Sequence, residues 1–523
     1  MSRSKVGIVG YGVYVPWERI RSEEVVKERE KGRKDLRQFL EKVRYGLHLN
    51  YKSVADTTED TITIAAEAAE NSLHMAQVKP LEIGSVAVGS ESKPYAVGTI
   101  ARHVASFLGI GENVFIADLE GACNSGMQGV SYIEAQIRTG RIKYGLAIGA
   151  DVAQAPKGDP LEYAAGAGAG AFVIGKSDVI ATIEDVAPYS SLFMDFWRRE
   201  ESPVPRHFGR TTVEAYQKHV IGAIEGILRR NPDMTLRDFD QITFHQPSGY
   251  LPLKTCQSLC QASNEFDDPS ITERIRLTPE DIERKVKPWL RVMDTGNTYA
   301  ASTLIAVASI LDRAEPGDNI LAVSYGSGAY ANATWLQVQD GIEQKRELVP
   351  KVDDYVGRKH EIRIETYKDI IRQRLSRIHR KIALTRLVGE IEPLGQQGFD
   401  MSLCQDCKRI YFPAREKCLN SDCKGPARTI WVPRRASMLS FKRLALKKRW
   451  TSNFELLNEG KTFFVDCRMN DLKVGMEVEA VIRRLHYEGK EGLISYGLCY
   501  RPIFRERFYD RRETTKMTVP QYA

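Results

Sequence analysis

The first 340 residues repeat one strand–helix–strand pattern, and this repeat constrains the fold more than any other feature. In the first copy the apolar run SVAVGS ends at Glu91, a helical pattern opens at Cys123, and the strand-like run YGLAIGAD follows. In the second copy QITF ends at His245, a helical pattern opens at Asn297, and NILAVSYGSG follows. Alternating strands and helices are typical of a layered α/β domain. Because α/β folds place their chemistry at strand carboxyl ends and helix N-termini, we expect these four residues to meet in one site.

Cys123 is surrounded by small residues in the stretch DLEGACNSGMQG. Small neighbours leave room for a substrate carbonyl to approach the sulfur within about 3–3.5 Å. A thiol at a helix N-terminus has a lowered pKa, so we expect Cys123 to be a reactive thiol. Glu91, if it lies in an apolar pocket, has a raised pKa that suits it to proton transfer.

Hydrogen-bond donors for a carbonyl oxygen are present in the second copy. The side chains of His245 and Asn297 can donate, and the glycine-rich stretch Gly326-Ser327-Gly328 offers backbone donors to an oxyanion. Taken singly, a cysteine or histidine is more often a core residue, and Gly-Ser-Gly is more often a turn. Their coincidence at repeat-equivalent positions favours a site for acyl transfer and carbon–carbon bond formation.

Four clustered cysteines indicate a metal site in the last third of the chain. They have the spacing C-x2-C-x10-C-x4-C and are Cys404, Cys407, Cys418 and Cys423. Soft thiolates at this spacing predict a structural, tetrahedral Zn²⁺ site, with a rubredoxin-type iron site as the alternative. The four cysteines without such partners, interpreted as core or surface residues, are Cys256, Cys260, Cys467 and Cys499.

Charge and cysteine usage restrict where the protein works and what it binds. An odd number of cysteines without a recognisable secretory signal predicts a reducing, cytoplasmic location, and no apolar run is long enough to span a membrane. The net charge is +7, and residues 429–450 carry seven cations, Arg434 and Arg435 among them, and no acid. Such a segment is either a binding surface for an anion, whether nucleic acid or a phosphate-bearing cofactor, or a solvated basic surface.

The first 340 residues resemble the thiolase superfamily, specifically the archaeal-type hydroxymethylglutaryl-CoA (HMG-CoA) synthases. The matching stretches include GIVGYGVYVP, VGSESKPYAV, ADLEGAC, DFWRREESPVPRHFGR, FHQPSGYLPLK, GNTYAAS and SYGSGA. The resemblance implies a duplicated, five-layer thiolase-like α/β fold. It also implies that Cys123 is acetylated by acetyl-CoA, Glu91 is the general acid/base, His245 contacts the acceptor ketone of acetoacetyl-CoA, and Asn297 helps to bind this second substrate. A cation follows FHQP in the family, and here Lys254 is the candidate for binding coenzyme A.

Residues 360–510 resemble a second group, the zinc-ribbon/OB-fold acyl-CoA-associated proteins called DUF35. The resemblance rests on SLCQDCKRIYFPAR and DLKVGMEVEAVI. It implies that the basic run, with Arg434 and Arg435, faces coenzyme A phosphates, and that a separate acetoacetyl-CoA thiolase is a possible partner. The thiolase resemblance implies a homodimer.

These resemblances predict five segments: thiolase-like halves at 1–175 and 176–342, a helical connector at 343–395, a zinc ribbon at 396–430 and an OB-fold barrel at 431–523. Two other functions stay open. One is a thiolase for a longer or aromatic β-ketoacyl-CoA, disfavoured because SYGSGAY lacks the second cysteine that thiolases use as a base. The other is a non-catalytic scaffold or nucleic-acid binder, disfavoured by the complete set of four candidate catalytic residues.

Overall fold

The computed structural model describes residues 5–153, 155–199, 202, 204–261, 269–375, 400–407, 410–411, 417–418, 423–431, 435–446, 449–458, 461–467, 474–487 and 494–503. The chain forms two compact units. The first comprises Met1–Ala105 and Ile110–Ser376, and the second comprises Ser106–Gly109 and Arg377–Ala523. Among the described residues, no helix combines the length and apolar character needed to cross a membrane.

A nine-stranded mixed sheet organises the first unit, in the order β11-β12-β13-β8-β1-β7-β6-β4-β5. The strands are β1 (Gly7–Tyr14), β4 (Ile83–Gly89), β5 (Phe115–Leu119), β6 (Tyr144–Val152), β7 (Ala167–Gly175), β8 (Ala181–Phe193), β11 (Gln241–Phe244), β12 (Asn319–Gly326) and β13 (Gly328–Val338). All four strand runs of the predicted repeat therefore lie in this sheet, as β4, β6, β11 and β12.

The sheet confirms the repeat that the sequence predicted. Strands β1 and β8 meet antiparallel at the middle of the sheet, where Gly7 pairs with Thr182 and Ile8 pairs with Ala181. On one side of this junction the order continues β7-β6-β4, and on the other side β13-β12-β11. Strand β4 is parallel to β6, just as β11 is parallel to β12. The two halves are therefore related by an approximate twofold axis at the β1–β8 junction.

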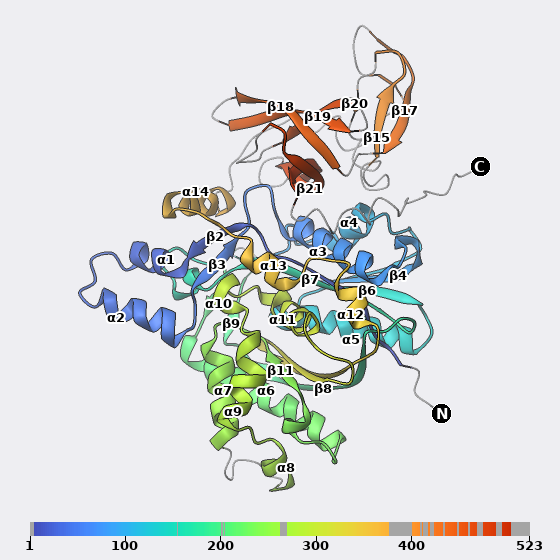
Figure 1. The fold of residues 1–523 in the computed structure, drawn as a ribbon. Helices are drawn as coiled ribbons and strands as arrows, with labels where there is room; N and C mark the ends of the chain where they lie inside the picture. Colours follow the sequence, from blue (N-terminus) through green and yellow to red (C-terminus); the bar gives the residue numbers. More distant parts are fainter. Residues whose placement is uncertain are drawn as a thin grey trace. The chain divides into compact units, whose positions relative to one another are not determined.

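Helices lie on both faces of the sheet and between its two halves (Figure 1). Helix α3 (Thr61–Ala76) packs on β1, β7 and β6, and α6 (Gly209–Arg230) packs on β13, β8 and β12. Helices α5 (Ser125–Arg138) and α11 (Ser302–Leu311) lie in the middle layer, where α11 contacts β7 of the first half and β11 and β12 of the second. The layers are thus helix, sheet, helices, sheet, helix, as the five-layer prediction required.

The sequence explains why the middle layer is so tight. All ten residues of α11 are buried, and this helix is apolar except for small Ser and Thr side chains. Strand β6 has a glycine, Gly149, where α11 begins, and a Cβ there would lie 2.2 Å from the carbonyl oxygen of Ala300. Any side chain at Gly149 would push α11 away from β6, so the close approach of the two halves depends on this glycine.

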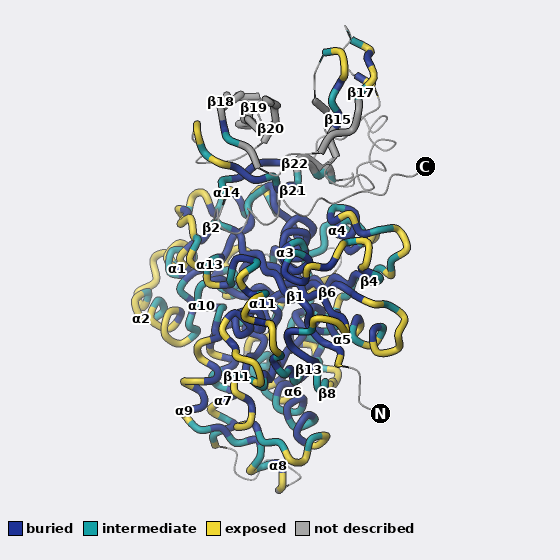
Figure 2. Tube along the Cα trace, turned by 45° about the vertical axis from the view of Figure 1, so that its right-hand side comes forward, coloured by how far each residue is buried: buried dark blue, intermediate teal, exposed yellow. Residues whose placement is uncertain are grey.

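Capping of α3 shows how local sequence sets a helix boundary. The Asp60 side chain accepts a hydrogen bond from the backbone N–H of Thr63, and the Thr63 hydroxyl oxygen accepts one from the backbone N–H of Asp60. This reciprocal capping box satisfies two donors that the first turn would leave unpaired, and a cap of this kind contributes about 1 kcal/mol. Almost all of helix α3 is buried, and Figure 2 shows it within the buried core of the first unit.

Three helices of the segment expected as a connector belong to the first unit. They are α12 (Ile342–Arg346), α13 (Val352–Gly357) and α14 (Ile364–Leu375). Helix α14 is hydrogen-bonded to the segment that follows β3 (Tyr51–Val54). The Arg374 guanidinium donates to the backbone carbonyl oxygens of Asp56 and Glu59. Residues 376–395, the rest of the expected connector, and residues 396–399, the start of the expected zinc ribbon, lie outside the described residues.

The second unit holds two small antiparallel sheets. The first has the order β16-β15-β17 and comprises β15 (Asp400–Cys404), β16 (Ile410–Tyr411) and β17 (Ala427–Trp431). The second has the order β20-β19-β18-β21-β22 and comprises β18 (Arg435–Leu446), β19 (Arg449–Asn458), β20 (Lys461–Cys467), β21 (Glu477–Tyr487) and β22 (Ile494–Pro502). Its outer strands β20 and β22 also contact each other, which is the arrangement expected of a small five-stranded barrel.

Candidate active site and cysteine cluster

Cys123 lies in a tight turn between β5 and α5. Ala122 has a positive φ of 47° and opens a 3₁₀ turn, Ala122–Asn124, that leads directly into α5. A non-glycine residue in the left-handed region costs energy and persists where its surroundings enforce it, often at a functional site. Cys123 itself is 7% exposed, so little of its side chain meets solvent.

The second half contains the same turn, without a thiol. Tyr299, with a φ of 49°, opens the 3₁₀ turn Tyr299–Ala301 just before α11. The structural counterpart of Cys123 is therefore Ala300, and Asn297 lies three residues earlier. Our prediction that Asn297 is the counterpart of Cys123 was therefore wrong by three residues. Asn297 is polar and resembles a helix N-cap, but the turn begins at Tyr299.

The structure brings Cys123 and Glu91 into direct contact. Glu91 lies two residues beyond the end of β4, and its Oε1 accepts a hydrogen bond of 2.7 Å from the Cys123 Sγ. The Arg198 Nη2 donates to the backbone carbonyl oxygen of Glu91 at 3.5 Å. The meeting of strand end and helix start that the repeat predicted thus occurs for these two residues.

Asp151 holds the Glu91 segment and was missed in the sequence analysis. Its Oδ1 accepts hydrogen bonds of 2.9 Å from the backbone N–H of Glu91 and from the Ser90 hydroxyl. Its Oδ2 accepts the backbone N–H of Ala300 at 3.0 Å, so this fully buried carboxylate joins the two halves. The sequence did contain a signal: Asp151 is an acid near the carboxyl end of the apolar strand β6.

Burial controls the protonation of this site. Burial, followed by the charge of Asp151, raises the pKa of Glu91 to about 8, and burial raises the pKa of Asp151 to about 6. Burial and the adjacent Glu91 raise the pKa of the Cys123 thiol well above its usual value. Our expectation of a lowered thiol pKa is therefore wrong, because desolvation and neighbouring carboxylates oppose the helix N-terminus. Cys123 therefore holds its proton near neutral pH and shares it in a hydrogen bond with Glu91.

His245 is the first residue after β11 and is 1% exposed. Its backbone is fixed by a bond from its N–H to Val323 and a bond of 2.6 Å from the Tyr216 hydroxyl to its carbonyl oxygen. Its Nδ1 is buried without a hydrogen-bond partner in the described part of the chain. Burial lowers the pKa of His245 to about 3, so the imidazole is neutral near pH 7 and has one N–H to donate.

Asn297 is held by the backbone of the segment before β7. Its N–H donates to the carbonyl oxygen of Ala164 at 2.7 Å, and its own carbonyl oxygen accepts from Gly166 at 2.8 Å. Its side-chain Oδ1 accepts the backbone N–H of Tyr299 at 2.8 Å, which leaves the amide NH₂ to donate. Asn297 thus precedes the turn that faces Asp151.

The predicted glycine-rich stretch lies beside the Cys123 turn. A Cβ at Gly326 would lie 2.4 Å from the Gly121 carbonyl oxygen and 3.0 Å from the Asn124 nitrogen, so only glycine allows β12 to approach this turn. The Ser327 hydroxyl donates to Asp195 at 3.2 Å, and Gly328 follows with a φ of +122°. Asp195 is a second acid that the sequence analysis missed, although it lies in the quoted stretch DFWRREESP.

The residues suggested for binding coenzyme A have no described contact with the site around Cys123. Lys254 lies half-buried on α7 (Tyr250–Gln261), which begins five residues after His245, and no described contact joins it to Cys123 or Glu91. Arg435 is the first residue of β18 in the second unit, and Arg434 lies outside the described residues.

The four cysteines of the second unit come together as a possible metal-ligand cluster. The Sγ atoms of Cys404, Cys407, Cys418 and Cys423 all lie within 4.8 Å of one another. The Cys404–Cys423 and Cys407–Cys418 sulfur pairs are 3.7 and 3.5 Å apart. Four thiolates at Zn–S distances of about 2.3 Å in a tetrahedron would have sulfurs about 3.8 Å apart, so this donor set fits Zn²⁺.

Comparison with known proteins finds similar chains for the first two thirds of this chain. Residues 50–177 match the family model "Thiolase, N-terminal domain". The chain is 43% identical over 353 residues to hydroxymethylglutaryl-CoA synthase of Methanopyrus kandleri, an alignment that covers 67% of this chain and 93% of the relative. It is 41% identical over 356 residues to the hydroxymethylglutaryl-CoA synthase of Archaeoglobus fulgidus, covering 68% and 95%. About a third of this chain lies outside these alignments.

Solved structures share the fold. An HMG-CoA synthase complexed with CoA matches with a TM-score of 0.60 and 24% identity, covering 70% of this chain and 90% of that one. The HMG synthase of the curacin biosynthetic pathway, in complex with acetyl donor-ACP, matches with a TM-score of 0.63 and 18% identity, covering 82% and 100%. The two archaeal relatives are more than 40% identical to this chain, and the alignments cover more than nine tenths of each of them. This chain therefore belongs to the hydroxymethylglutaryl-CoA synthase family of condensing enzymes.

Proposed function

We propose that this chain condenses acetyl-CoA with acetoacetyl-CoA to form HMG-CoA through an acetyl-Cys123 intermediate. The observation that carries the proposal is the 2.7 Å contact between the Cys123 thiol and the Glu91 carboxylate at the junction of the two halves. A nucleophile in contact with a buried carboxylate can lose and regain its proton without exchange with solvent. The carboxylate also favours a synthase over a thiolase, in which a second cysteine is the base.

In the first step Cys123 is acetylated. The sulfur attacks the thioester carbonyl of acetyl-CoA as the thiol proton moves to Glu91, and the oxyanion forms beside the backbone of the Cys123 turn and the Gly326-Ser327-Gly328 stretch. The new bond joins the Cys123 sulfur to the acetyl carbon. The bond from that carbon to the CoA sulfur breaks, and the proton on Glu91 leaves with the CoA thiol.

In the second step Glu91 acts as the base. Its carboxylate removes a methyl proton from the acetyl thioester, and the resulting carbanion attacks the ketone carbon of acetoacetyl-CoA. The ketone oxygen becomes an alkoxide and takes the proton back from Glu91, which gives a hydroxyl group. Water then hydrolyses the thioester to Cys123 and frees HMG-CoA. The raised pKa of Glu91 suits both roles, since the carboxyl group is near half-protonated at about pH 8.

His245 and Asn297 bind the acceptor as neutral donors. Because burial holds the pKa of His245 near 3, its imidazole orients the ketone oxygen with an N–H and does not neutralise it with a positive charge. The Asn297 amide NH₂ supplies a second donor, its oxygen being occupied by Tyr299. Backbone hydrogen bonds hold both His245 and Asn297 in place, which suits two residues that must orient a substrate.

The remaining features complete the proposal. Zn²⁺ bound by Cys404, Cys407, Cys418 and Cys423 would hold the small β15–β17 sheet together, with no part in the chemistry. Lys254, Arg434 and Arg435 are candidates for contacts with coenzyme A. We also propose the segment boundaries given above, a cytoplasmic homodimer, and a separate thiolase that supplies acetoacetyl-CoA; these rest on family resemblance.

The test is an assay of the purified full chain with acetyl-CoA and acetoacetyl-CoA, with products identified by mass. We expect HMG-CoA and free CoA in equal amounts. The same assay with a panel of longer β-ketoacyl-CoAs, run in both directions, tests the thiolase alternative. Cleavage of those substrates without any HMG-CoA would contradict the proposal.

A further inference from the structure

Cys123 lies in a small apolar cluster whose walls come from two surface segments. The cluster consists of Cys123, Ala155, Ala165 and Tyr299, and Leu161 and Phe196 pack against it. Leu161 lies on the 3₁₀ turn Pro160–Tyr163, and Phe196 lies on β9 (Phe196–Trp197), whose partner strand is β10 (Arg206–His207). The Phe196 ring is 6.2 Å from the ring of Tyr299. Neither large side chain is carried by the central sheet.

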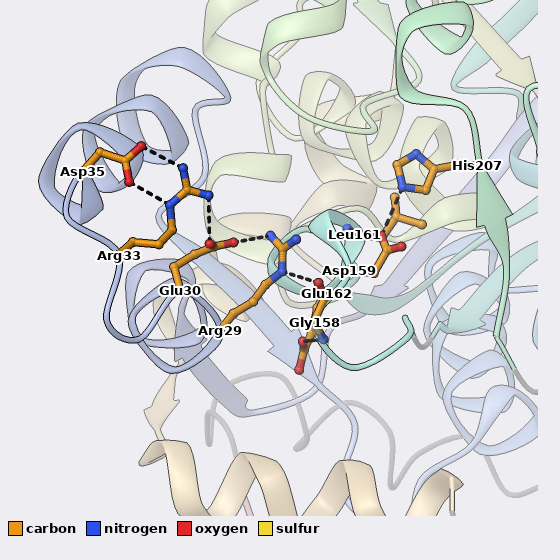
Figure 3. A network of polar contacts seen from close by, with 9 residues as sticks. All are labelled: Arg29, Glu30, Arg33, Asp35, Gly158, Asp159, Leu161, Glu162 and His207. Atoms are coloured by element: carbon orange, nitrogen blue, oxygen red, sulfur yellow. Dashed lines mark hydrogen bonds and ion pairs between the residues drawn. The ribbon is translucent and has the colours of Figure 1, made fainter.

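A histidine–carboxylate pair ties these two segments together (Figure 3). Asp159 Oδ1 accepts the backbone N–H of Leu161 at 2.9 Å, and the same oxygen accepts Nε2–H of His207 at 3.1 Å. His207 pairs with Phe196 in the β9–β10 ladder. One carboxylate oxygen therefore fixes the Leu161 backbone directly and the Phe196 backbone through its ladder partner.

The Leu161 segment is also held from its other side. The Arg29 Nε donates to the Gly158 carbonyl oxygen at 2.6 Å, and the Gly158 N–H donates to Glu162 Oε2 at 2.8 Å. Figure 3 shows that these contacts continue through Glu30 to Arg33, just after helix α1 (Ser22–Arg29). Because the segment is anchored to α1 and to β10, Leu161 cannot easily retreat from the cluster.

We propose that Asp159 and His207 are positioning residues that set the length of the acyl group that Cys123 accepts, by holding Leu161 and Phe196 against the cluster around the sulfur. The inference rests on the proposed acylation of Cys123 and goes beyond it. An acetyl group has one methyl to accommodate, whereas a butyryl group extends two methylenes further and must displace one of the two walls. Without the pair, the β9–β10 ladder and the Leu161 turn separate and the longer chain fits.

The Asp159–His207 pair affects the positions of Leu161 and Phe196 more than it affects the stability of the fold. Both side chains are 20% exposed, so water and salt screen their attraction, and a partly exposed pair contributes at most about 1 kcal/mol to folding. Loss of the pair therefore leaves the protein folded and leaves Cys123 beside Glu91. What changes is the room next to the sulfur, and acyl-chain selectivity measures that room.

The experiment measures acylation of Cys123 in the full chain by intact mass, with acetyl-CoA and with butyryl-CoA. For His207→Ala we expect the acetyl-to-butyryl rate ratio to fall about tenfold, with the acetyl rate near that of wild type. His207→Gln, which retains an amide donor for Asp159, should restore the ratio. Asp159→Ser keeps a cap for Leu161 but is too short to reach His207, so it should behave like His207→Ala.

Two further sets of variants isolate the cause. Leu161→Ala and Phe196→Ala remove the walls themselves and should lower the ratio at least as far. The matched control is His360→Ala, because His360 Nδ1 makes an equivalent 2.8 Å contact with Glu18. This contact lies in a separate three-stranded sheet, in which β2 (Glu18–Arg21) lies between β14 (His360–Glu361) and β3. This control should leave the ratio unchanged.

A wild-type ratio in both His207→Ala and Asp159→Ser would overturn the inference, as would an equal fall in His360→Ala. Thermal melting of each variant separates a selective effect from unfolding. If wild type itself is not acylated by either donor, the proposed function fails, and that result differs from acylation with an unchanged ratio, which refutes the positioning role alone.

Discussion

The Cys123 thiol and the Glu91 carboxylate are 2.7 Å apart, with the thiol as donor. They come from different elements of the first half, and Asp151 fixes the Glu91 backbone while binding Ala300 of the second half. The proton that leaves sulfur on acylation therefore has an acceptor in contact with it. Proton transfer, acylation and carbanion formation are thus expected to depend on the same two side chains.

Replacing Cys123 should abolish covalent acylation. We expect [¹⁴C]acetyl-CoA to label wild type but neither Cys123→Ala, which has no nucleophile, nor Cys123→Ser, whose hydroxyl is a much weaker nucleophile than the thiol. Cys260→Ala, a partly buried cysteine on α7, is the control and should be labelled like wild type. Equal labelling of wild type and Cys123→Ala would place the nucleophile elsewhere.

Glu91→Gln should separate the two steps. The amide still fills the site beside the sulfur, so acetylation should continue at a reduced rate. Condensation should fall about 10²–10⁴-fold, because an amide cannot remove the methyl proton. Single-turnover formation of acetyl-enzyme, followed by a chase with acetoacetyl-CoA, measures both rates. Condensation near the wild-type rate would rule Glu91 out as the base.

The condensation rate should rise with pH through the pKa of Glu91. Only the ionised carboxylate is a base, and its pKa is raised to about 8, so the rate should increase between pH 7 and 9. Asp151→Asn removes a negative charge that raises this pKa, so the ascending limb should move to lower pH. An unchanged limb in Asp151→Asn, with folding intact, would mean that another group controls the profile.

Glu91 should destabilise the folded protein at high pH. Its pKa is raised from 4.5 to about 8 on folding, so the folded state favours the protonated form. Stability from this group is complete below pH 4.5 and is lost as the pH rises through about 8. Glu91→Gln should therefore melt at a higher temperature than wild type at pH 8.5 and show a smaller difference at pH 5. A difference that does not depend on pH would contradict this linkage.

Metal analysis should find about one zinc per chain. The four sulfurs are spaced for tetrahedral coordination, and a structural zinc of this kind contributes directly to folding. Cys404→Ser or Cys418→Ser should lose the zinc and expose this region to proteolysis, while Cys499→Ser should retain it. An absorbing iron centre, or no metal in wild type, would refute the zinc assignment.

Sequence alone identified the parts of this protein that depend on local pattern. Strand runs such as YGLAIGAD and NILAVSYGSG lie where expected, because an apolar β-branched run bounded by turns specifies a buried strand. The repeat predicted two halves and the contact between Cys123 and Glu91. The four-cysteine spacing predicted the sulfur cluster, since knuckle spacing constrains geometry over a few residues.

Only the tertiary structure decided the electrostatics and the distant partners. The repeat predicted that Glu91 lies near Cys123, but the thiol pKa rises chiefly because Cys123 is desolvated, and the residues around Cys123 do not specify that burial. The links from Asp151 to Ala300 and from Asp159 to His207 join positions far apart in the chain. Local sequence specifies backbone conformation over a turn or two, whereas desolvation and long-range pairing arise only when the layers have packed.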